Sequence, residues 1–131
     1  MKGTEKQIKW AQDIVNKTTD IIENNDFLTD SEKGNAIVKI RRLDDAAWII
    51  ENRYNLDDVS YVLENIATDE EITELASKIT NPQIIKRIKA KKYEGREGRY
   101  REITESMIVD ILNISRGKVI ARVYDELARR L

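Results

Sequence analysis

Apolar residues recur every three or four positions through most of this chain, and that spacing constrains the fold more than any other feature. A stripe of this period lies on one face of an α-helix, whereas a half-buried strand needs strict alternation. The single proline and five glycines leave long stretches of the pattern uninterrupted. The sequence therefore predicts an all-α protein, a long antiparallel helical hairpin followed by a bundle of shorter helices.

The hairpin is predicted from two long patterns in the first half. Thr4 and Gln7 have the spacing of a capping box, which predicts a helix over residues 4–23. A turn is expected at residues 24–26, and a second helix from about residue 31 to about residue 55. This second helix carries an apolar seam with spacing 4, 3, 4, 3, 4, made of Ala36, Ile40, Leu43, Ala47, Ile50 and Tyr54. Two long helices joined by a short loop form an antiparallel pair.

The second half predicts shorter helices. Asn55 marks one helix start, and Thr68 with Glu71 forms a capping box at the next. Pro82 marks a third start, because proline at the first helical position loses no needed hydrogen bond. Two further helices are expected over residues 103–112 and 120–127, with a break at residues 115–117, although residues 118–124 alone also fit a strand.

A domain boundary is expected near residues 67–69, where the long-helix pattern gives way to short helices. It divides the chain into a helical hairpin region, residues 1–66, and a basic helical region, residues 67–131. A chain of 131 residues suffices for one domain, so we expect the two regions to share a core.

The composition argues against an enzyme. The chain has no histidine and no cysteine, so the commonest general base, thiol nucleophiles and most zinc ligands are absent. It has no P-loop and no dinucleotide fingerprint, and its paired carboxylates fit neither an EF-hand loop nor a two-metal nuclease. Most of these acids fall in expected first helical turns, where the helix dipole favours negative charge. We expect no catalytic residue, no metal and no cofactor.

The cellular setting follows from similar absences. No apolar run approaches the roughly 20 residues that span a bilayer, and the N-terminal segment lacks the apolar part of a signal peptide. The lack of cysteine gives no mark of an oxidising compartment. A cytoplasmic protein without a membrane partner is expected.

Charge is sorted along the chain. Residues 1–80 carry 10 Lys or Arg against 17 Asp or Glu, and residues 81–131 carry 13 against 7. Residues 86–101 (KRIKAKKYEGREGRYR) hold eight cations, two carboxylates, two tyrosines and two glycines that predict a loop. Clustered cations attract phosphate or an acidic surface, and tyrosines can stack on bases. The predicted nucleic-acid or partner-binding residues are Lys86, Arg87, Lys89, Lys91, Lys92, Tyr93, Arg96, Arg99, Tyr100 and Arg101. The competing interpretation is a solvated charged face, partly neutralised by Glu94 and Glu97.

Residues 74–88 also resemble a helix-turn-helix. Two short apolar helices flank a tight connection at residues 80–82, and the second helix of such a unit enters the major groove. Gln83, Lys86 and Arg87 are then the base-reading residues. The match departs from the usual pattern, since Thr80 stands where the turn normally has glycine and the turn is about one residue short.

Two segments carry a family resemblance. Residues 3–14 (GTEKQIKWAQDI) and 45–53 (DAAWIIENR) resemble small uncharacterised proteins of Gram-positive phages, plasmids and integrative elements. Those proteins open with G-(S/T)-x-K-Q-I-x-W-A-x-x-I and later carry W-(W/F)-I-(D/E)-x-R. The second segment departs from the pattern, with a lone Trp48 preceded by Ala47 in place of the aromatic pair. The resemblance implies a mobile-element origin and a bacterial host cytoplasm, and no established activity.

The aromatic residues of these segments have a structural interpretation first. Trp10 and Trp48 lie beside the apolar stripes of the two long helices, so both are expected to fill one end of a core. Arg53 is expected to stack on an indole or to pair with a carboxylate.

The functional hypothesis is a non-catalytic accessory protein of a phage or mobile element that binds nucleic acid or a nucleoprotein. An inhibitor of a host defence complex, of the anti-CRISPR kind, is one concrete version, with a host protein complex as target. If about five cations contact phosphates, the log-log salt slope of affinity is about −4 to −5. The alternatives are a helix-turn-helix-like DNA-binding regulator, or a protein-only adaptor or homodimer built on the second helix and the acidic surface.

Overall fold

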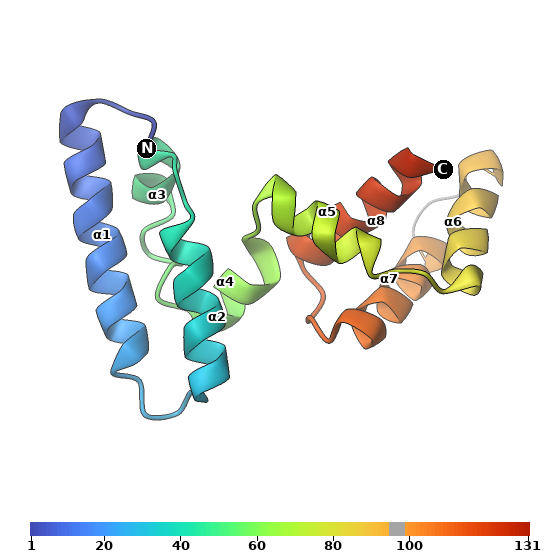
Figure 1. The fold of residues 1–131 in the computed structure, drawn as a ribbon, viewed down its shortest axis with the longest axis horizontal. Coiled ribbons are helices and arrows are strands. Elements are labelled where there is room, and N and C mark those ends of the chain that lie inside the picture. Colours follow the sequence, from blue (N-terminus) through green and yellow to red (C-terminus); the bar gives the residue numbers. More distant parts are fainter. Residues whose placement is uncertain (95–98) are drawn as a thin grey trace. The chain divides into compact units, whose positions relative to one another are not determined.

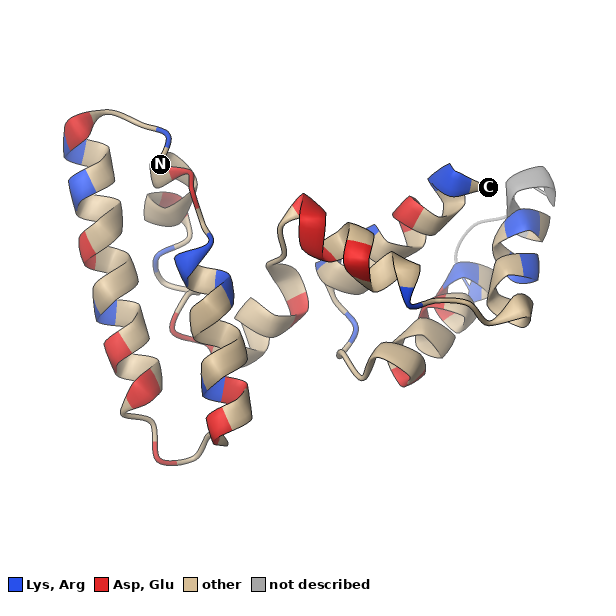
Figure 2. Ribbon diagram, in the orientation of Figure 1, with Lys and Arg blue, Asp and Glu red and all other residues tan. Residues whose placement is uncertain are grey.

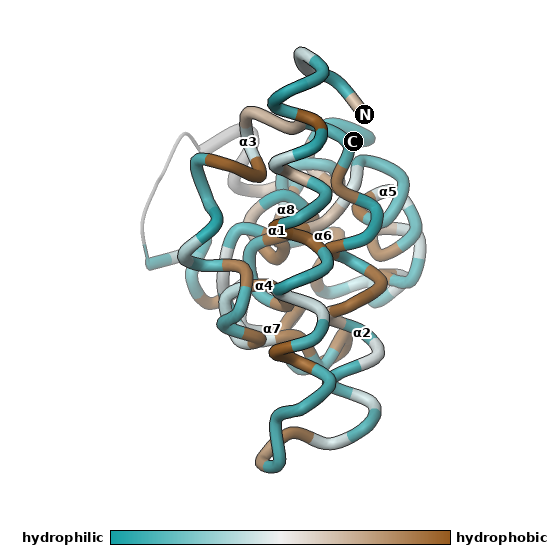
Figure 3. Tube along the Cα trace, turned by 90° about the vertical axis from the view of Figure 1, so that its left-hand side faces the viewer, coloured by the Kyte–Doolittle hydropathy of each residue, from teal (hydrophilic) through white to brown (hydrophobic). Residues whose placement is uncertain are grey.

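Every regular element in the described part of the chain is an α-helix, and the connections between the helices are short. The computed structural model describes residues 1–94 and 99–131, and of residues 91–94 the backbone alone. The helices are α1 (Glu5–Glu23), α2 (Asp30–Arg41), α3 (Ala46–Glu51), α4 (Val59–Asn65), α5 (Asp69–Ser77), α6 (Pro82–Glu94), α7 (Arg99–Leu112) and α8 (Lys118–Arg130) (Figure 1). Hydrophobic positions recur at intervals along them (Figure 3). The predicted all-α class is confirmed for these residues, and no helix among them is long and apolar enough to cross a membrane.

The chain divides into two compact units, Met1–Ile66 and Ala67–Leu131. Where the sequence favours one core shared by both regions, the buried side chains form two separate clusters, one in each unit. The first cluster comprises Ala11, Ile22, Ala36, Ile40, Ala46, Ile49, Leu56, Val59, Val62 and Ile66. The second comprises Ile72, Ala76, Ile79, Ile84, Ile88, Ile108, Val119, Ile120, Val123, Tyr124 and Leu127.

In the first unit α1 begins where the sequence predicts it. The Thr4 hydroxyl accepts a hydrogen bond from the Gln7 amide at 3.2 Å, and the Gln7 side chain accepts one from the Thr4 amide at 3.0 Å. Both bonds satisfy amides that lack partners at a helix start, as a capping box does. α1 packs on α2 and α3, and α2 packs on α4.

The predicted second long helix is wrong, because it is broken at residues 42–45. The Asp45 side chain accepts a hydrogen bond from the Trp48 amide at 3.3 Å and so starts α3 as a new helix. The break changes which face turns inward. Ala46 and Ile49 are fully buried, whereas Ala47, which the predicted seam places in the core, is exposed.

The break is held by the N-terminal segment. The Lys2 amide donates to the Asp44 carbonyl at 2.6 Å, and the Ala46 amide donates to the Lys2 carbonyl at 2.8 Å, which makes a single parallel bridge. Backbone groups that a continuous helix would pair internally are thus satisfied by residues some forty positions earlier. Gly3 connects this bridge to the capping box of α1.

Gly3 is the position where a side chain is expected to be costly. Its φ is +138°, and a Cβ would lie 2.9 Å from the Ala46 Cβ. We expect Gly3→Ala to lower the free energy of unfolding by about 1–3 kcal/mol, measured by urea denaturation. Gly34→Ala is the matched control, because Gly34 lies inside α2 with nothing within 4 Å of its Cβ. That change should stabilise by about 0.5–1 kcal/mol, and equal losses at both sites would contradict the structure.

Several of the remaining helix starts are shifted from the expected positions. α2 begins at Asp30, where Thr29 and Glu32 form a capping box, and α7 begins at Arg99, four residues before the expected start. α4 is capped by Asp58, whose side chain accepts from the Tyr61 amide at 3.3 Å, and not by Asn55 as expected. Thr68 caps α5 and accepts from the Glu71 amide at 3.2 Å. The expected break between the last two helices is confirmed at residues 113–117, and residues 118–124 are helical. The strand alternative for that segment is therefore wrong.

The two tryptophans differ in burial. Trp48 packs, partly buried, against the core cluster of its unit. Trp10 is 49% exposed, so the expectation that both indoles fill one end of a core is wrong for Trp10. The Arg53 guanidinium lies over the Trp10 ring, 5.3 Å from its centroid, which confirms stacking on an indole.

Candidate nucleic-acid interface

The basic face of α6 is set by how this helix begins and what it buries. The Asn81 side-chain oxygen accepts from the amides of Gln83 at 2.8 Å and Ile84 at 3.4 Å, so Asn81 caps the helix ahead of Pro82. Ile84 and Ile88 turn into the core of the second unit, with exposures of 0% and 2%. A spacing of four residues places both on one face of the helix, so the residues between them point elsewhere.

Two predicted contact residues, Lys86 and Lys89, share the outer face of α6 with the predicted base reader Gln83. Gln83, Lys86 and Lys89 are spaced by three residues and are all exposed. Arg99, at the first position of α7, is exposed as well. The three cations Lys86, Lys89 and Arg99 form no ion pair with a residue whose side chain is described. Figure 2 marks the Lys and Arg positions along α6 in blue.

Arg87 points the other way and joins α6 to α7. Its guanidinium donates to the Thr104 hydroxyl at 3.0 Å and to the Tyr100 carbonyl at 3.3 Å. The same group lies over the Tyr100 ring at 4.2 Å, and the Tyr100 hydroxyl donates back to the Arg87 carbonyl at 3.0 Å. The Thr104 hydroxyl in turn donates a hydrogen bond to the Tyr100 carbonyl at 3.0 Å. Arg87 and Tyr100 therefore already have intramolecular partners.

Arg101 joins α7 to α8 in a second network. Its guanidinium contacts the Glu105 carboxylate at 2.7 Å and the Asp125 carboxylate at 3.0 Å, and donates to the Ala121 carbonyl at 3.3 Å. It also lies over the Tyr124 ring at 4.4 Å. Burial alone lowers the pKa of Arg101, but hydrogen bonds to Glu105 and Asp125 outweigh it and raise that pKa. Burial raises the pKa of Tyr124, partly offset by the Arg101 charge.

The remaining predicted residues have no side-chain description. Lys91, Lys92 and Tyr93 lie in the last turn of α6, where the backbone alone is described. Arg96 and the loop predicted from Gly95 and Gly98 lie outside the described residues. The structure therefore brings Gln83, Lys86 and Lys89 together and gives Arg87, Tyr100 and Arg101 internal roles.

The base-reading arrangement of a helix-turn-helix is poorly matched. The two helices of such a unit pack on each other, which fixes the angle at which the second enters a groove. Here the close helix pairs of the second unit are α5–α8, α6–α7, α7–α8 and α6–α8. Both α5 and α6 turn their apolar faces toward the shared cluster on α8. Of the predicted base readers, Gln83 and Lys86 face outward and Arg87 faces α7.

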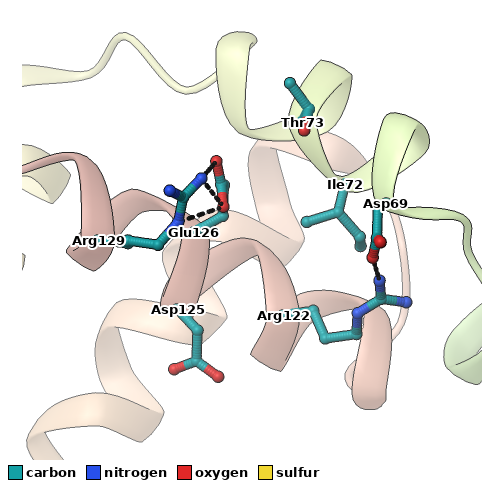
Figure 4. A pocket seen from close by; sticks show the side chains of 7 residues that line it. All are labelled: Asp69, Ile72, Thr73, Arg122, Asp125, Glu126 and Arg129. Carbon is teal, nitrogen blue, oxygen red and sulfur yellow. Dashed lines mark hydrogen bonds and ion pairs between the residues drawn. The ribbon is translucent and has the colours of Figure 1, made fainter.

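A cleft between α5 and α8, of about 430 Å³, is lined by charged side chains (Figure 4). Its arginines are already engaged. Arg122 contacts Asp69 at 2.8 Å and donates to the Ala67 carbonyl at 2.6 Å. Arg129 contacts Glu126 at 2.6 Å, and its hydrogen bonds hold the pKa of that carboxyl below its ordinary value. The Arg122–Asp69 pair connects α8 to the start of α5, whereas the Arg129–Glu126 pair lies within α8. Arg130 adds a second link between the helices by donating to the Thr73 carbonyl at 3.3 Å, so the cleft is best explained as a structural contact.

The partners of the arginines are what sequence reasoning missed. Glu105 is four residues after Arg101, a spacing that is readable as a helical ion pair once the helix is placed. Thr104 and Asp125 could not be paired with Arg87 and Arg101 before the packing of α6, α7 and α8 was known. Counting charges along the chain thus overstates the number of cations available to a ligand.

Comparison of the chain with protein-family models, with curated proteins and with solved structures found no match. What the chain does must therefore be inferred from its own residues and contacts.

Proposed function

We propose that this chain acts by binding, and that the exposed basic face of α6, with Arg99 nearby in sequence, contacts the phosphates of a nucleic acid or nucleoprotein. The observation that carries the proposal is that some cations of the segment 86–101 are exposed while others have intramolecular partners. Lys86, Lys89 and Arg99 are exposed without ion pairs to described residues, whereas Arg87 and Arg101 are held by neighbouring helices. Free surface cations release counterions from a phosphate backbone and so supply sequence-independent affinity.

The contacts on the described residues suit phosphates better than bases. The Tyr100 ring lies against the Arg87 guanidinium and its hydroxyl is hydrogen-bonded, so it is not an open platform for stacking. Lysine is a flexible point charge that meets phosphate oxygens without reading sequence. Gln83 is the one described residue on this face with an amide for base edges. We therefore expect weak sequence preference, which favours an accessory binding protein over a promoter-specific regulator.

The resemblance of residues 3–14 and 45–53 to mobile-element proteins supports placing this binding in a phage or mobile element. One concrete form of this function is inhibition of a host defence nucleoprotein, of the anti-CRISPR kind. Such an inhibitor acts by binding and needs no catalytic residue. This form is consistent with the charges of the two units, because the second unit carries 14 Lys or Arg against 11 Asp or Glu and the first carries 9 against 13. Each unit can then meet a different part of a ribonucleoprotein surface.

The test is a salt titration of binding with a paired substitution. We expect the double variant Lys86→Ala, Lys89→Ala to bind fluorescent duplex DNA, single-stranded DNA or RNA more weakly in an anisotropy assay. Its log-log salt slope should be shallower by about 2, because about one counterion is released for each lost phosphate contact. Stability should change by less than about 0.5 kcal/mol, since both side chains are exposed.

Lys6→Ala, Lys9→Ala is the matched control, because it removes the same charge at the same helical spacing from exposed positions on α1. We expect this variant to retain the wild-type slope. A wild-type slope near zero, or equal losses in both double variants, would remove the proposed interface.

A further inference from the structure

A second candidate binding site lies in the first unit, along α1. A groove of about 450 Å³ is formed by one face of α1 and by the segment that connects α3 to α4. Its α1 wall runs from Trp10 to Ile21, eleven residues apart, which corresponds to about 16 Å of helix. That volume lies within the range of ligand sites, and its length matches a short stretch of peptide.

Large apolar and aromatic side chains are exposed in this groove. Trp10 is 49% exposed, Ile21 44% and Tyr54 80%. None of the three belongs to the buried core cluster of the unit. Isolated exposed apolar residues are ordinary, but three that line one groove mark a site of contact.

The groove already holds one guanidinium. The Arg53 head group lies 5.3 Å from the Trp10 ring centroid and 4.6 Å from that of Tyr54. It donates to the Ile50 carbonyl and, at 3.4 Å, to the Tyr54 hydroxyl. Two rings and a carbonyl therefore fix this cation, and much of the aromatic surface remains open. The geometry shows that the rings accept a planar cation.

The two carboxylates of the groove have no ion-pair partner among the described residues. Asp13 and Asp57 line it and are exposed, and neither forms an ion pair with a described residue. Lys17 also lines the groove, but the unit as a whole carries 9 Lys or Arg against 13 Asp or Glu. The acidic excess belongs to the unit, because the two carboxylates of the groove lining are matched in number by Lys17 and Arg53. The field of the unit favours a ligand with positive charge, and the two lining cations limit how many cations fit.

We propose that this groove docks an arginine-bearing peptide segment of a partner protein. The guanidinium lies on the open surface of Trp10 or Tyr54, and its charge pairs with Asp13 or Asp57. The aliphatic stem of arginine covers apolar surface, here Ile21. Lysine lacks the planar group and is more strongly hydrated, so it fits the same surface less well. This inference does not depend on nucleic-acid binding by α6.

The experiment uses the full chain carrying Trp48→Phe, which leaves Trp10 as the one tryptophan. Octa-arginine and octa-lysine peptides are titrated while Trp10 emission and calorimetric heat are followed. We expect octa-arginine to bind saturably with a change in emission, and at least about five times more tightly than octa-lysine. In the chain that retains Trp48, Trp10→Ala should weaken octa-arginine binding about tenfold by calorimetry, as loss of an interface aromatic does.

Charge is tested by two matched double variants. Asp13→Asn, Asp57→Asn removes the groove carboxylates and should weaken octa-arginine binding about tenfold. Asp20→Asn, Asp26→Asn removes the same charge from exposed positions outside the groove and should change it less than about twofold. Equal losses in the two variants, or equal affinity for both peptides, would reduce the effect to general charge attraction and overturn the proposal. Tighter binding by an uncharged amphipathic peptide would overturn it in favour of apolar docking.

Discussion

We expect Ile49→Ala to lower the free energy of unfolding by about 3 kcal/mol, measured by urea denaturation. Ile49 has no exposed surface and packs in the core cluster of the first unit. Removing its outer carbons loses apolar burial and leaves a cavity that the surrounding helices fill only in part. The midpoint should fall while the slope with denaturant stays constant, because the surface exposed on unfolding is nearly unchanged.

The companion change is Ala47→Lys. Ala47 is exposed on α3, so a lysine there reaches solvent and should change stability by less than about 0.5 kcal/mol. A single helix over residues 31–55 requires the opposite, because its seam turns Ala47 into the core. A severe loss for Ala47→Lys together with a small loss for Ile49→Ala would show that α2 and α3 are continuous.

This pair of positions shows why part of the fold was readable from sequence and part was not. The starts of α1, α5 and α6 depend on side chains one to three residues away, at Thr4, Thr68 and Asn81. Such signals are local and appear in the sequence itself. The break before α3 depends also on Lys2, which supplies backbone partners from the other end of the unit. The apolar seam predicted for residues 36–54 fits one long helix, so it does not predict the contact with Lys2 that interrupts the helix.

The candidate interface, too, was only partly predictable, because some of its contacts join residues far apart in the sequence. The density of cations in residues 86–101 was visible, and the outward position of Lys86 and Lys89 follows from the burial of Ile84 and Ile88 on the other face of the helix. The intramolecular contacts of Arg87 and Arg101 depend on how α7 and α8 pack, which local sequence patterns do not reveal. Arginine is the cation suited to such roles, because its planar group both stacks on a ring and bonds several oxygens.

We expect Arg101→Ala to lower the free energy of unfolding of the second unit by about 2–3 kcal/mol, a large effect for a residue that is not fully buried. The substitution removes the nearest cation to Glu105, whose side chain is 12% exposed, and leaves Arg116 at 3.9 Å. It also removes the hydrogen bond to the Ala121 carbonyl and the cover of the Tyr124 ring. A carboxylate left mostly buried without its main partner is costly, and the 29% exposure of Arg101 keeps the loss below that of a fully buried pair.

Adding Glu105→Gln to that variant should recover about 1 kcal/mol, because the amide carries no uncompensated charge. Lys89→Ala, an exposed cation removed from the same unit, should leave stability within about 0.5 kcal/mol of wild type. If Arg101→Ala proves as neutral as Lys89→Ala, the network does not hold α7 to α8, and Arg101 returns to the set of cations free to contact phosphate. If it destabilises as expected, any loss of nucleic-acid affinity in that variant must be measured where the second unit remains folded. The double variant at Lys86 and Lys89 is then the better test of function, because it should weaken nucleic-acid binding while leaving the free energy of unfolding nearly unchanged.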